Sequence, residues 1–63
     1  MVSNTEAIAV SGAMERYGGS FVKKLGELIM LADPENRQKI RETWPKYWLE
    51  YAHAVFDGHG PNE

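Results

Sequence analysis

The two histidines of this sequence, His53 and His59, are the side chains that first raise the question of metal binding. Asp57 lies between them, four residues after His53 and two residues before His59. Structural zinc sites use four close-set ligands, and catalytic zinc sites usually use three. This segment supplies two or three ligands in what we expect to be a flexible tail. The sequence therefore predicts neither a metal site nor a cofactor.

Possible nucleophiles and acid–base groups have simpler local roles. The hydroxyls of Ser11, Ser20 and Thr43 have no histidine nearby in sequence to serve as a general base. Tyr17-Gly18-Gly19-Ser20 lacks the lysine and the preceding strand of a phosphate-binding loop. The glutamates that could act as acids lie mainly on polar helix faces or at helix starts: Glu15, Glu27, Glu35, Glu42 and Glu50. We therefore expect a protein that is not an enzyme.

Arginine and aromatic side chains gather between residues 37 and 51. Trp, Tyr and Arg commonly dominate the binding energy where they cluster at an interface. Two interpretations stay open, because such a cluster can equally be packed in the core. Arg37 and Arg41 lie one helical turn apart and could rim an aromatic surface. The predicted interaction residues are Arg37, Arg41, Trp44, Tyr47, Trp48 and Tyr51.

A helix-turn-helix that binds DNA is the alternative function. The second and third predicted helices, with the corner between them, have the order of that motif. The third helix carries residue types that read base edges, namely Asn36, Arg37, Gln38 and Arg41. Against this alternative, Asp33 and Glu35 stand at the end of the helix that would enter the groove, where they would repel phosphates.

Length and charge narrow these choices. Sixty-three residues form one domain at most, and so short a chain buries only about 60% of its unfolded surface. Self-association would bury more, so we expect a homodimer, a partner protein from the host or from a phage, or both. With no cysteine, the chain has no disulfide to stabilise it. The net charge of −2, from seven basic and nine acidic residues, disfavours nucleic acids and anionic membranes.

Hydropathy places the protein in water rather than in a membrane. The longest apolar run, residues 28–32, is far shorter than the roughly 18 residues that span a bilayer. The first residues have neither the basic segment nor the continuous apolar segment of a secretory signal. We therefore expect a cytoplasmic protein.

Helices are the only elements that the apolar spacing predicts. The first helix is expected over residues 5–17, capped by Ser3, Asn4 or Thr5. Gly18-Gly19 should end it, since glycine adopts a positive φ without steric cost, and Ser20 should cap the next helix. In that second helix, residues 21–32, the apolar arc holds Phe21, Val22, Leu25, Leu28, Ile29 and Ala32. Small residues that would allow close helix crossings are Ala9, Gly12, Ala13 and Gly26.

Asp33-Pro34-Glu35-Asn36 predicts a sharp corner between helices. Asp33 can cap a new helix with its carboxylate, and Pro34 suits the first helical position because it has no amide hydrogen. The third helix should extend to about Thr43, with Ile40 as its one aliphatic anchor. Pro45 either kinks that helix or, as we favour, lies in the first turn of a fourth helix capped by Thr43 or Trp44.

The fourth helix, expected to end near Phe56, has an unusually wide apolar arc. Its apolar residues cover roughly 220° of the helical wheel, which leaves only Lys46, Glu50 and His53 for solvent. One neighbouring helix would bury about half of such an arc. The surplus indicates packing on several sides, an oligomer, or a partner interface.

Three segments together resemble a known group of proteins. They are residues 17–25 (YGGSFVKKL), residues 32–37 (ADPENR) and residues 44–48 (WPKYW). Over residues 12–52 the chain resembles short uncharacterised proteins encoded by bacteriophages, prophages and other mobile elements. The resemblance implies a bacterial or phage cytosolic origin and favours an interaction role, and it assigns no functional residue.

Together these patterns predict an all-α protein. Three to four short helices should form a compact helical hairpin or small bundle that associates as a dimer. The single helical domain should cover residues 1–57, followed by a flexible tail, residues 58–63. The leading hypothesis for function is a non-enzymatic interaction protein that binds itself, a host protein or a phage protein.

Overall fold

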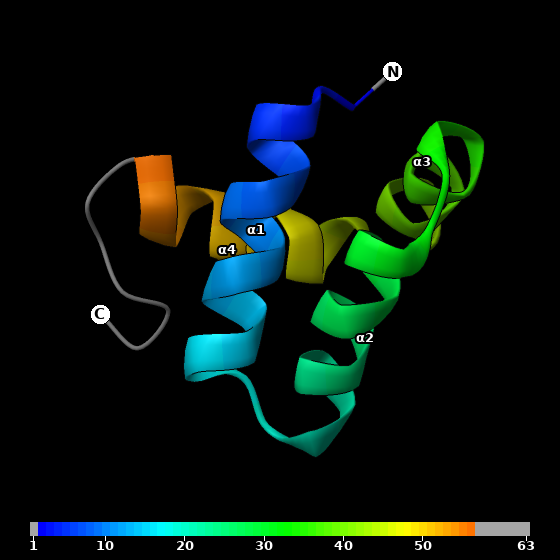
Figure 1. Cartoon of the computed structure of the whole chain (residues 1–63). Coiled ribbons are helices and arrows are strands. Elements are labelled where there is room, and N and C mark those ends of the chain that lie inside the picture. The colour runs from blue at the N-terminus through cyan, green and yellow to red at the C-terminus, as the bar shows by residue number, and fades with distance from the viewer. Residues whose placement is uncertain (1, 57–63) are drawn as a thin grey trace.

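The computed structural model describes residues 2–56, and within them the chain folds into four α-helices (Figure 1). They are α1 (Asn4–Tyr17), α2 (Ser20–Leu31), α3 (Pro34–Thr43) and α4 (Pro45–Phe56). The prediction of a small all-α bundle is confirmed. Asp57, His59 and the tail predicted for residues 58–63 lie outside the described residues.

The first helix is the centre of the arrangement. It runs antiparallel to α2, while α4 crosses behind it (Figure 1). The side chain of Ser3 caps α1 by accepting a hydrogen bond from the Glu6 amide at 3.1 Å. The core lies on both sides of α1 and consists of Ala7, Val10, Ala13, Met14, Val22, Leu25, Ile29, Ile40, Trp48 and Tyr51.

The turn between α1 and α2 lies where it was predicted, but its backbone differs. Gly18 and Gly19 have φ values of −81° and −77°, so the expected positive φ was wrong. A Cβ atom on Gly18 would lie 2.5 Å from Val22 Cγ1 and 2.6 Å from the Met14 carbonyl oxygen. Gly18 is therefore required by the tight return of the chain and not by a left-handed conformation.

The prediction that Ser20 caps α2 was wrong. Gly19 occupies the N-cap position without a side chain to bond, and Ser20 is already the first helical residue. The Gly19 carbonyl accepts the first helical hydrogen bond, from the Lys23 amide at 2.8 Å. The helix therefore starts one residue earlier than predicted.

The predicted corner at Asp33 is confirmed. The Asp33 carboxylate accepts a hydrogen bond from the Asn36 amide at 2.8 Å, and Pro34 is the first residue of α3. A second break follows at Trp44, whose φ and ψ of −124° and 61° are not helical. Pro45 then begins α4, so the chain changes direction twice within a short stretch.

The buried face of α2 is rotated from the predicted arc. Its buried residues are Val22, Leu25, Gly26 and Ile29. Phe21 and Leu28, which were expected inside, are 55% and 47% exposed. The cause is the close crossing with α1, where a Cβ on Gly26 would lie 2.9 Å from the Ser11 carbonyl oxygen. The prediction that Gly26 serves a close helix crossing is confirmed.

Candidate interaction surface

The aromatic residues of the fourth helix divide between core and surface. Trp48 and Tyr51 are buried, with 1% and 5% of their surface exposed. The Trp48 indole donates a hydrogen bond of 2.6 Å to the Glu6 carboxylate, which ties α4 to the first turns of α1. Trp44 is half-buried and Tyr47 is 39% exposed. Two of the four aromatic residues predicted for interaction are therefore unavailable to a partner of the folded chain.

The Tyr51 phenol is perturbed by its position. Burial raises the pKa of Tyr51 above its ordinary value of 10.0, and the nearby Glu50 and Tyr47 raise it further because they disfavour a second negative charge. The phenol therefore stays neutral throughout the physiological range. Its role is that of a core residue rather than of an acid or a base.

Trp44, at the break before α4, and Tyr47 of α4 meet a third ring, that of Phe21 from α2. The Phe21 and Trp44 ring centroids are 6.0 Å apart with the planes at 67°, an edge-on arrangement. Phe21 and Tyr47 are 5.8 Å apart at 46°. Such aromatic pairs are stabilising at these separations. Sequence reasoning had assigned Phe21 to the core, and its spacing of seven residues from Leu28 was the available signal that both flank the same edge of α2.

Of these three rings, that of Trp44 also lines a groove between α2 and α3. The groove has a volume of about 380 Å³ and is lined by Leu28, Leu31, Ala32, Asn36, Lys39, Ile40, Thr43 and Trp44. Trp44 also borders an adjoining hollow of about 540 Å³, which includes Tyr47 and Lys46. Leu31, at the end of α2, is 83% exposed. We call this recess between α2 and α3, together with the neighbouring rings of Phe21 and Tyr47, the apolar groove.

The two predicted interaction arginines lie elsewhere. Arg37 donates from Nε to the Ile29 carbonyl at 3.1 Å and from Nη1 to the Asn4 side chain at 2.7 Å. Arg41 borders a small hollow of about 160 Å³ with Val2, Glu6 and Gln38. Both arginines are thus on the side of α3 that approaches the start of α1. The structure does not bring them together with the aromatic residues.

Residue types proposed to read DNA bases are also engaged within the chain. Besides the two bonds of Arg37, the Gln38 side chain accepts from the Val2 amide at 3.0 Å and donates to Glu42 at 3.1 Å. Reading bases with these side chains would require these hydrogen bonds to break.

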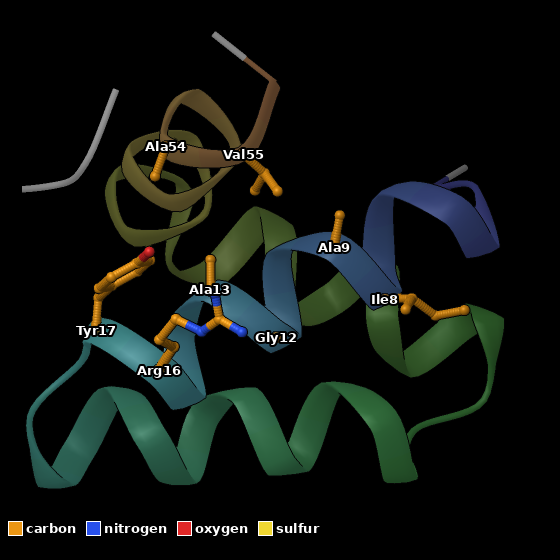
Figure 2. Close-up of a pocket in the computed structure, with 8 residues that line it drawn as sticks. All are labelled: Ile8, Ala9, Gly12, Ala13, Arg16, Tyr17, Ala54 and Val55. Atoms are coloured by element: carbon orange, nitrogen blue, oxygen red, sulfur yellow. The ribbon is translucent and has the colours of Figure 1, made fainter. Parts of the chain in front are cut away.

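Another hollow lies between α1 and the end of α4. It has a volume of about 330 Å³, and its lining is drawn in Figure 2: Ile8, Ala9, Gly12, Ala13, Arg16, Tyr17, Ala54 and Val55. Gly12 was expected to serve a close helix crossing, but a Cβ placed on it would meet nothing within 4 Å. In the folded chain the close crossing uses Gly26 instead, and the surface over Gly12 is open.

The candidate nucleophiles Ser11 and Thr43 have structural partners. Ser11 is buried and donates to the Gly26 carbonyl at 2.7 Å, while Thr43 donates to the Lys39 carbonyl, also at 2.7 Å. Across residues 2–56, no three His, Cys, Asp or Glu side chains group closely enough to hold a metal ion. Within the same part of the chain, no helix has the length and apolar character needed to cross a bilayer.

Comparisons with protein-family models, with curated proteins and with solved structures gave no match to this chain.

Proposed function

We propose that this chain is a non-enzymatic interaction protein that binds another protein chain through the apolar groove. The observation that carries the proposal is the contact of exposed Phe21 with exposed Tyr47 and with half-buried Trp44, which also lines the groove beside the exposed leucines of α2. Contiguous apolar surface on a soluble protein commonly marks an interaction site. Trp and Tyr are also the residues most enriched among those that dominate binding energy.

The origin suggested by the sequence fits the same proposal. Small proteins of phages and mobile elements often act in the cytosol by binding a host or phage protein. In this proposal the partner is a protein, and it is either a second copy of this chain or a different chain. Arg37 links α3 to the start of α1 through its hydrogen bond to Asn4, and Arg41 borders the small hollow on the same side, so neither arginine belongs to the proposed binding surface.

Site-specific photocrosslinking tests the proposal. A benzophenone amino acid in place of Tyr47 should form a covalent adduct with a partner chain in extracts of expressing cells. The matched control carries the same group in place of Glu35, which is exposed in the first turn of α3 outside the groove. Adding Leu31→Lys to the Tyr47 probe should abolish its adduct. Equal labelling from both positions, or no adduct from either, would reject the proposal.

A further inference from the structure

The chemistry of the apolar groove identifies one kind of occupant. Resting on the proposed function, we infer that the groove binds a second copy of this chain in a symmetric dimer. In this dimer Leu31 of each copy inserts into the groove of the other, against Leu28, Ile40 and Trp44. A twofold dimer places the same surface on both sides, so that surface must complement itself in shape and in charge.

Shape complementarity is present within the single face. Leu31 is a projecting side chain with 83% of its surface exposed, and it stands on the wall of a groove of about 380 Å³. A groove of this volume has room for a leucine side chain, since pockets of about 300 Å³ already hold whole small ligands. The face therefore contains both a projection and a recess.

Charge around the groove favours a copy of the same chain over a strongly charged partner. Lys24 lies on α2 between Phe21 and Leu28 and pairs with Glu27 at 3.4 Å. On the other side, Lys39 borders the groove, and Lys46 and Glu50 border the adjoining hollow. Because lysines and glutamates both flank this surface, a twofold axis can place unlike charges opposite each other. A rim of one sign would repel its own copy.

The size of the chain gives the third argument. A stable interface removes about 800 Å² from each partner, which is about a fifth of the 4171 Å² that the chain exposes. Chains of this length bury a small share of their surface on folding and commonly gain stability by association. A dimer through the groove would cover three of the four large apolar side chains of α2 that the single chain leaves exposed, namely Phe21, Leu28 and Leu31 but not Met30.

Analytical ultracentrifugation of the full chain, from about 1 µM to about 1 mM, tests this inference. We expect a monomer–dimer equilibrium whose dissociation constant rises at least about tenfold in Leu31→Lys, because a buried leucine is worth a factor of that order. Leu31 is exposed in the single chain, so its helical content and unfolding midpoint at low concentration should be retained.

The matched control is Ile8→Lys. Ile8 is an aliphatic residue, 57% exposed, in the hollow between α1 and α4, so the substitution places the same charge away from the groove. It should leave the dissociation constant unchanged. The inference is overturned if the chain stays monomeric throughout, if Leu31→Lys has no effect, or if Ile8→Lys weakens the dimer equally. If the chain is monomeric and the Tyr47 probe crosslinks to a protein whose mass differs from that of this chain, the inferred dimer is overturned. The proposed function then still stands.

Discussion

At the scale of single residues, two glycines in helices have opposite surroundings. Gly26 lies under α1, where an added Cβ would come within 2.9 Å of the Ser11 carbonyl oxygen and 3.0 Å of the Met14 Cβ. Gly12 faces open space. Neither conformation demands glycine, so only the space around each position decides what alanine does there.

We therefore expect alanine substitutions of opposite sign. Gly12→Ala should raise the free energy of unfolding by up to about 1 kcal/mol, because alanine forms helix more readily than glycine. Gly26→Ala should lower it by about 1–3 kcal/mol, since backbone must shift to admit the methyl group. Urea denaturation followed by circular dichroism measures both. Stabilisation by both substitutions would show that α1 and α2 are not in close contact at Gly26.

At the scale of elements, α3 depends on its ends more than on its core contact. Ile40 is its one buried residue, and the remaining residues, which are polar except for Pro34, are partly or fully exposed. Its start is fixed by Asp33 and Pro34, and its end by the break at Trp44. This helix forms one wall of the apolar groove, so its stability governs the shape of the proposed binding surface.

Removing the cap should be measurable in the unfolding of the whole chain. Asp33→Ala deletes the acceptor for the Asn36 amide and should cost about 1 kcal/mol. In a domain of this size that loss lowers the melting temperature by about 4–8 °C. Asp33→Asn keeps an acceptor and should retain most of the stability. An equal loss in both variants would mean that the charge near the helix start matters more than the hydrogen bond.

At the scale of the whole molecule, the core is shared by helices on both sides of α1. Tyr51 and Trp48 pack from α4, while Val22, Leu25 and Ile29 pack from α2. A perturbation of one buried group is therefore transmitted to the stability of the entire fold. Ionisation of the Tyr51 phenol at high pH is such a perturbation, and it requires no change of sequence.

Stability should fall as the pH rises above about 10. The unfolded Tyr51 ionises near its ordinary pKa of 10.0, whereas in the folded chain burial raises the pKa of the same phenol. The unfolded state then holds fewer protons than the folded state, so the free energy of unfolding decreases with increasing pH. Denaturation curves across this range should show the decrease, and Tyr51→Phe should flatten it. An unchanged slope in Tyr51→Phe would assign the effect to other groups.

The helix boundaries were largely readable from the sequence because local chemistry fixes them. Asp33 and Pro34 predicted the start of α3, and Pro45 predicted the start of α4. The break at Gly18 was also placed correctly. The reason that glycine is needed there was not predicted correctly, because the closeness of Val22 and of the Met14 carbonyl depends on how the chain returns after the turn.

The candidate site was only partly predictable. Trp44 and Tyr47 were assigned to the interaction set and do lie on the surface, but Trp48 and Tyr51 are in the core. A wide apolar arc on one helix cannot show which part faces a neighbour. The spacing of Phe21 and Leu28 indicates a shared edge of α2, but the contact of Phe21 with Trp44 and Tyr47 depends on packing between helices distant in sequence.

The acidic corner was a matter of sequence alone, since it depends on which residues are present and how they are spaced, and the prediction that the chain is not an enzyme rests on the same kind of information. The tertiary structure decided which apolar residues are buried and which form the groove. The physical reason is the crossing of α1 and α2 at Gly26, which rotates α2 so that Val22 and Ile29 face the core while Phe21 and Leu28 remain in solvent.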